Sequence, residues 1–84
     1  MQTFTYDIGD WADKLDAWCI AIRNLARAHG VAHRLYIGDA IKEIRKPATT
    51  TWQPTKRIDE SFRMAVAGGI PEEELLAIRT LIFG

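Results

Sequence analysis

Two histidines are spaced closely enough to suggest metal chemistry. His29 and His33 are four residues apart, and on one continuous helix this spacing would let both imidazoles bind a single ion. However, Gly30 lies between them at an expected helix end, and no second cysteine or nearby carboxylate completes a ligand set. We therefore expect no metal site and no cofactor, with His29 hydrogen-bonded to the last carbonyls of its own helix.

The sequence also lacks the common catalytic motifs. It contains no glycine-rich phosphate loop, no Gly-x-Ser-x-Gly turn and no paired-cysteine motif. The single cysteine, Cys19, has no neighbouring base that would activate its thiol. It cannot form an internal disulfide, which fits a reducing compartment. These absences predict a non-enzymatic, cytoplasmic protein.

A tryptophan in a basic segment is the strongest candidate for contact with a partner. Trp52 lies in the polar segment 47–54, with lysines and arginines on both sides. An aromatic side chain in such a loop can anchor a protein interface, stack on an unpaired base or fold back to cover the core. We predict an interface anchored by Trp52, in which four cations attract an acidic partner surface: Arg45, Lys46, Lys56 and Arg57.

Charge is unevenly distributed along the chain, although the formal net charge is zero. Residues 17–58 carry eight Lys and Arg against two acids, whereas residues 1–16 and 59–84 are both net acidic. The middle segment can form a basic patch that attracts phosphate or an acidic protein surface. Alternatively, the acidic ends fold over the middle segment and neutralise it.

The size and composition of the chain fit one soluble domain covering residues 1–84. Its 84 residues are 48% hydrophobic and 26% charged, which is typical of a small globular domain. No uncharged stretch approaches the ~20 residues of a membrane-spanning helix. The first ten residues lack the basic and apolar regions of a signal peptide.

The apolar periodicity predicts four short helices, and thus an all-α, compact bundle. The expected helices cover residues 11–28, 33–46, 55–67 and a last segment that begins with Pro71 at its first turn. Residues 3–6 alternate like a short N-terminal strand or arm. Residues 31–37 also alternate, so that a strand remains an alternative to helix there.

Two of these helices carry apolar side chains in unusual places. Ile20 falls in the middle of the polar face of the helix at 11–28, where it is either a single exposed residue or a partner contact. The last helix is apolar around most of its circumference, which is typical of a helix that is central in the fold or buried against another subunit. For the second alternative, the candidate interface residues are Leu76, Leu81 and Phe83.

Residues 61–80 carry the small and apolar residues of a short helical hairpin. Ala65 is followed by Gly69 four positions later, and apolar residues follow Gly69. This segment resembles the helix-turn-helix motif of DNA-binding regulators, which implies a close helix approach at Ala65 and a tight turn at Gly69. The sequence departs from the motif at residues 72–74, where three glutamates would face a phosphate-lined groove.

Together these features favour a small protein-binding module that masks the surface of a partner protein, as an inhibitor, adaptor or accessory factor does. The small size fits a phage or mobile-element protein. A helix-turn-helix-like transcriptional regulator that binds DNA is the first alternative, and a homo-oligomeric structural subunit, such as a homodimer, is the second. The sequence predicts no association with a membrane.

Overall fold

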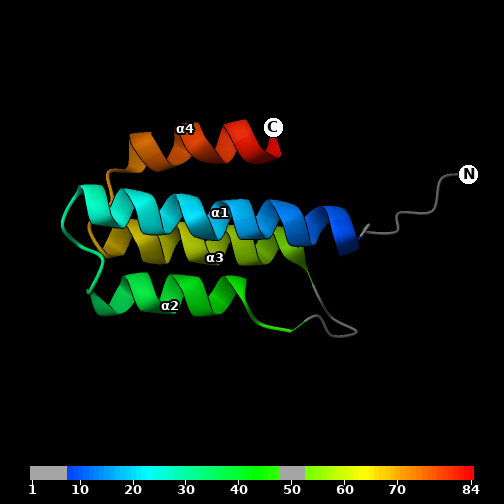
Figure 1. Cartoon of the computed structure of the whole chain (residues 1–84), viewed down its shortest axis with the longest axis horizontal. Coiled ribbons are helices and arrows are strands. Elements are labelled where there is room, and N and C mark those ends of the chain that lie inside the picture. The colour runs from blue at the N-terminus through cyan, green and yellow to red at the C-terminus, as the bar shows by residue number, and fades with distance from the viewer. Residues whose placement is uncertain (1–7, 48–52) are drawn as a thin grey trace, which may run out of the picture.

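The computed structural model describes residues 8–47 and 53–84 and contains four helices in them. The helices are α1 (Ile8–Ala28), α2 (Leu35–Ile44), α3 (Pro54–Ala67) and α4 (Glu72–Phe83). The prediction of an all-α bundle of four short helices is therefore confirmed (Figure 1). The predicted strand or arm at residues 3–6 lies outside the described residues.

The segment between α1 and α2 is a series of turns. Gly30 has a positive φ of 69°, which reverses the chain after α1. The Val31 N–H then bonds to the carbonyl of Ala26 at 2.8 Å, and the Arg34 N–H bonds to the carbonyl of Val31 at 3.0 Å. These bonds place residues 31–34 in turns, so the strand alternative is wrong there and α2 begins at Leu35.

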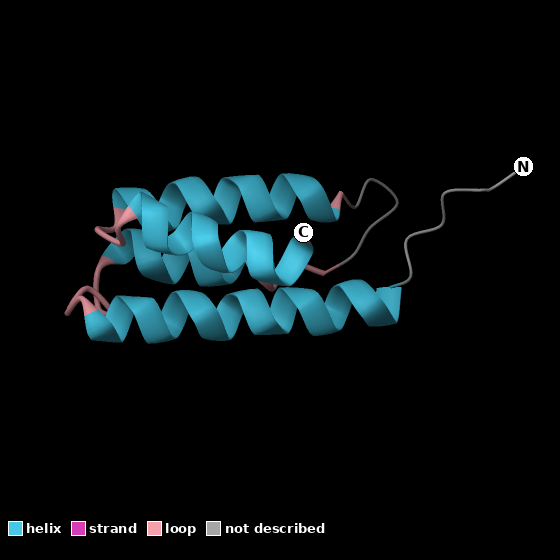
Figure 2. Cartoon of the chain, turned by 90° about the horizontal axis from the view of Figure 1, so that it is seen from above, coloured by secondary structure: helices cyan, strands magenta, loops and turns pink. Residues whose placement is uncertain are grey.

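Helix α1 lies in the middle of the bundle and contacts each of the other three helices. Helix α2 packs mainly against α3 and less extensively against α1, whereas α4 packs mainly against α1 and less extensively against α3. All four helices run roughly along the long direction of the molecule (Figures 1 and 2), and α4 lies at one edge of the bundle in Figure 1. In the part of the chain that the structure describes, no helix is long and apolar enough to cross a membrane.

The core is built around the tryptophan of α1. Trp18 is fully buried, and its ring stacks on Phe62 of α3 with centroids 6.4 Å apart. The edge of Phe83 in α4 contacts the same ring at 5.8 Å. The indole Nε1 donates a hydrogen bond to the hydroxyl of Ser61, so that one side chain holds α1, α3 and α4 together.

Close approaches join α2 to α3. Gly68 ends α3 against Ile37 of α2, and a Cβ at position 68 would lie only 2.7 Å from Ile37 Cδ1. At the other end of α2, the buried guanidinium of Arg57 donates to the carbonyl of Pro47 at 3.0 Å and to that of Lys46. The carbonyls of Lys46 and Pro47 lie beyond the last turn of α2, where the helix supplies no backbone N–H donor for them. The side chain of Arg57 supplies the missing donors.

The position of α4 excludes one of the two interpretations of its apolar surface, and the other, a subunit interface, stays a prediction. Leu75 is fully buried, but Leu76 is 50% exposed and Leu81 is 86% exposed. Phe83 is partly buried and stacks on Trp11 at 6.0 Å. The central position is therefore wrong, and two of the three predicted interface residues are exposed in the single chain.

The helix-turn-helix resemblance extends to the turn but not to the packing. Gly69 has a positive φ of 114°, as a tight turn between two helices requires. In a DNA-binding motif the two helices cross at about 90–120°. Here α4 runs back alongside α1, and α3 and α4 share only a small contact (Figure 1).

Candidate interaction surface

A cleft lies between α1 and α2 near the end of the bundle where the two helices are connected. Its volume is about 240 Å³, which is below the range of about 300–1,000 Å³ that is usual for small-molecule sites. It is large enough for one or two side chains of a bound protein. We call it the α1–α2 cleft, and its lining residues are Arg23, Ala26, Arg27, Ala32, His33, Ile37, Gly38 and Ile41.

Small residues create the cleft, and basic residues surround it. Ala26 of α1 and Gly38 of α2 carry little or no side chain, and a Cβ at position 38 would meet nothing within 4 Å. Arg23 and Arg27 are four residues apart, so that they project from neighbouring turns of the same helix face. His33 comes from the turn that precedes α2. The result is an apolar floor with a cationic rim.

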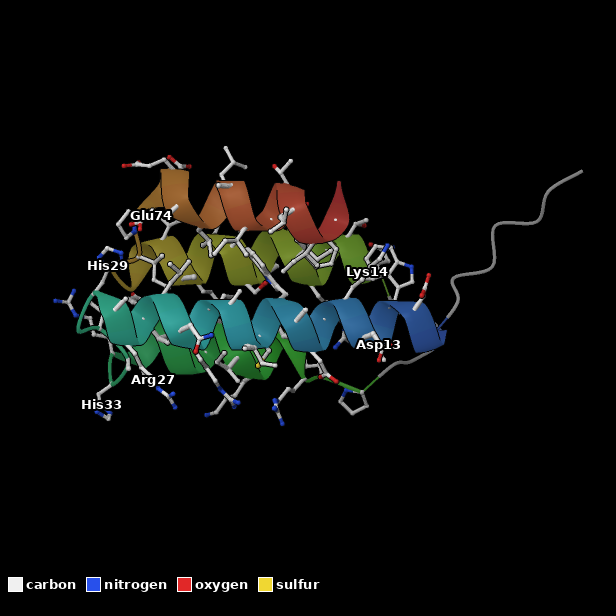
Figure 3. The ribbon with its side chains drawn as sticks, turned by 45° about the horizontal axis from the view of Figure 1, so that its top comes forward. Asp13, Lys14, Arg27, His29, His33 and Glu74 are labelled. Atoms are coloured by element: carbon white, nitrogen blue, oxygen red, sulfur yellow. The ribbon has the colours of Figure 1, made fainter. Side chains whose placement is uncertain are left out.

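The rim side chains form no ion pair with any residue that the structure describes. Within residues 8–47 and 53–84, the four ion pairs involve His29, Lys46, Arg63 and Arg79, and none of the three rim residues. Arg23, Arg27 and His33 are all exposed. Figure 3 shows Arg27 and His33 on the same side of the bundle.

The predicted contact residues are distributed over more than one part of the surface. Ile20 is 56% exposed and lies one helical turn before Arg23, but it does not line the cleft. Arg45 is exposed and follows Ile41 by one turn on α2. Lys46 is exposed but is paired with Glu43 at 2.7 Å, and Lys56 is exposed at the start of α3.

Two of the predicted contact residues, Arg57 and Trp52, differ from the exposed cations described above. Arg57 is only 8% exposed, and its guanidinium bonds to carbonyls at the end of α2. A role in attracting a partner stays a prediction for this residue, and the proposal below does not use it. Trp52 lies outside the described residues, so its role as an anchor also stays a prediction.

His29 joins two helices. Its Nε2 lies 2.7 Å from Glu74 Oε2, so it contacts α4 and not the carbonyls of its own helix (Figure 3). The expected contact with those carbonyls is therefore wrong. Among the described residues, no group of three or more His, Cys, Asp or Glu side chains is arranged to hold a metal ion.

Sequence reasoning did not single out the rim of the cleft. Arg23 and Arg27 were recognisable as part of the basic segment 17–58, which predicted a basic patch without singling them out, and His33 as one half of a metal-like spacing. The i, i+4 spacing of the arginines was a usable signal. Their relation to Gly38 and Ile41 depends on the packing of α1 against α2, which the sequence pattern does not contain.

Comparisons of the chain with protein-family models, with curated proteins and with solved structures found no match.

Proposed function

We propose that this protein is a small, non-enzymatic protein-binding module whose α1–α2 cleft binds an acidic segment of a partner protein. The observation that carries the proposal is an apolar floor beside three basic residues, Arg23, Arg27 and His33, that form no ion pair among the described residues. Such a site suits a segment in which an apolar side chain enters the cleft while neighbouring carboxylates meet the arginines. The free, buried thiol of Cys19 supports a cytoplasmic setting.

Two features favour a protein partner over a nucleic acid. Non-specific binding of single strands uses aromatic side chains on which bases stack, and the residues that line the cleft are aliphatic or basic. At the same end of the bundle, α4 begins with Glu72, Glu73 and Glu74, all exposed. These carboxylates would repel a phosphate backbone that extended beyond the cleft.

The mode of action that fits this surface is masking. A bound segment would be covered on one side by α1 and α2, and its carboxylates would be neutralised by Arg23 and Arg27. In this proposal the exposed side chains of Ile20 and Arg45, each one helical turn from a lining residue of its own helix, extend the contact surface. A partner that needs this acidic segment for its own contacts would lose access to it.

The test is a binding titration with a fluorescein-labelled peptide of alternating Glu and Leu, followed by fluorescence anisotropy. The Lys–Leu peptide of the same length is the control ligand. We expect saturable binding of the acidic peptide alone, weakened by about tenfold or more, ~1.4 kcal/mol, in each of Arg23→Glu and Arg27→Glu.

Lys56→Glu is the matched control, because Lys56 is an exposed cation that does not line the cleft. If Lys56→Glu weakened peptide binding equally, the binding site would lie at the predicted cations around residues 45–57 and not at the cleft. Equal binding of both peptides, or binding that Arg23→Glu and Arg27→Glu leave unchanged, would contradict the proposal.

A further inference from the structure

The outward face of α1 has the spacing of a helix that packs against another helix. The residues on this face alternate in steps of three and four, as the seam of a coiled coil does. All of them are exposed, and in the described part of the chain none of α2, α3 and α4 covers them. We call this face the α1 seam, and its residues are Asp10, Asp13, Ala17, Ile20, Asn24 and Arg27.

Charge is ordered along this seam. Asp13 and its neighbour Asp16 lie in the first half of α1, whereas Arg23 and Arg27 lie in the second half. Figure 3 shows Asp13 and Arg27 toward opposite ends of the helix. The small or apolar seam residues lie between the two halves. A helix with this pattern complements its own antiparallel copy and repels a parallel one, since a parallel copy would bring like charges together.

We propose that a second copy of this chain packs antiparallel on the α1 seam and forms a symmetric dimer. In this arrangement Ala17 faces Ile20 of the second copy, and the two-fold axis passes between these positions. Asp16 of each chain lies beside Arg23 of the other. Because the interface is isologous, every such contact occurs twice.

The same pairing extends toward the ends of the two helices. Asp13 lies opposite Asn24 of the second copy and one turn from its Arg27. Ala17 lets the helix backbones approach closely, and Ile20, which is 56% exposed in the single chain, becomes buried. The interface is a single helix pair with few apolar side chains, so we expect a dimer that dissociates on dilution and at high salt.

The two charged residues at the centre of this interface, Asp16 and Arg23, do not pair with each other within one chain. Asp16 and Arg23 are seven residues apart on α1, which separates them by about 10 Å along the axis. Among the described residues, neither takes part in an ion pair. Both are therefore available to a second molecule.

This inference rests on the proposed function. It identifies the acidic first half of α1 in a second copy as one protein surface that the basic second half of α1 binds. Arg23 and Arg27 belong to the rim of the α1–α2 cleft as well as to the dimer contact. The dimer and an acidic segment of another protein would therefore compete for the same two arginines.

The test uses charge reversal and analytical ultracentrifugation over a range of concentrations at low salt. We expect the wild-type chain to dimerise, and Asp16→Arg or Arg23→Asp to raise the dimer dissociation constant at least about tenfold, because each variant places two like-charged pairs at the interface. The double variant Asp16→Arg/Arg23→Asp and an equimolar mixture of the two single variants should both regain dimerisation. Circular dichroism checks that the variants are folded.

Two results would overturn the proposal. One is a wild-type chain that stays monomeric throughout the range, and the other is a charge swap that fails to restore the dimer. Leu81→Glu separates this interface from one on α4, since loss of the dimer in that variant alone would place the contact at α4.

The outcomes for the dimer and for the cleft can be told apart. Asp16→Arg leaves the lining of the cleft unchanged, so this variant should still bind the Glu–Leu peptide as a monomer. Peptide binding without dimerisation would reject the dimer and leave the cleft proposal standing. Dimerisation without peptide binding would reject the cleft and support the α1 seam.

Discussion

Trp18 Nε1 donates a hydrogen bond to the Oγ of Ser61 at 2.8 Å, across 43 positions of the sequence and in the interior of the bundle. The serine hydroxyl in turn donates to the carbonyl of Arg57 at 2.6 Å, one turn earlier in α3. Both side chains are fully buried. The indole N–H is thus satisfied without water, and the polar atom of the largest core residue specifies how α1 lies on α3.

Replacement of Ser61 by alanine tests this contact. The variant leaves a buried indole N–H without an acceptor, and we expect a loss of about 1–3 kcal/mol in the free energy of unfolding, measured by urea denaturation. Trp18→Phe removes the donor, so Trp18→Phe/Ser61→Ala should cost less than the sum of the two single variants. Additive costs would show that the bond contributes no stability beyond packing.

Arg57→Met removes a buried guanidinium but keeps much of the side-chain volume. The carbonyls of Lys46 and Pro47 lose their donors, and we expect a loss of about 1–3 kcal/mol in urea denaturation. Lys56→Met is the neighbouring control, and as an exposed substitution it should change stability by less than about 0.5 kcal/mol. Similar losses of unfolding free energy in the two variants would contradict the structural role that we assign to Arg57.

Two glycines should respond in opposite directions to substitution by alanine. Gly69 has a φ of 114°, and a Cβ there would lie 3.1 Å from Val31 Cγ1, so Gly69→Ala should destabilise the fold by about 1 kcal/mol or more. Gly38 lies within α2 with open space around it, and Gly38→Ala should stabilise the fold by about 0.5–1 kcal/mol. Thermal unfolding of both variants beside the wild type measures the difference in sign.

The thiol of Cys19 reports on opening of the contact between α1 and its neighbours. It is 2% exposed, so a disulfide reagent should react slowly with the native protein and fast with the unfolded chain. If labelling requires global unfolding, the rate should increase in Gly69→Ala by about tenfold for each ~1.4 kcal/mol of lost stability. Fast labelling of the native wild-type protein would mean that this part of the core opens independently of global unfolding.

The elements of this fold follow closely from local patterns. The predicted helix at 11–28 ends at the observed residue, Ala28, and the predicted end of the third helix, Ala67, also agrees with the structure. These boundaries depend on apolar periodicity and on Gly30 and Gly68, which act within a few residues. Local signals of this kind are present in the sequence whatever the tertiary arrangement is.

The features that depend on packing were not predictable in the same way. The sequence predicts that Arg57 is an exposed cation. In the structure it is buried, and its guanidinium donates to a backbone carbonyl beyond the end of α2. The apolar surface of α4 predicted a central or buried helix, and the structure places the helix at the edge, with Leu81 exposed. The α1–α2 cleft arises only when Gly38 meets Arg23 and Ala26 across two helices.

The contact between Gly68 and Ile37 has an evolutionary consequence. A side chain at position 68 would overlap the outer carbons of Ile37, which is itself 3% exposed and held in the core. A larger residue at position 68 therefore requires a shorter side chain at position 37. Among descendants of a common ancestor, a larger residue at 68 should be accompanied by a shorter one at 37, and this pair should show correlated substitution.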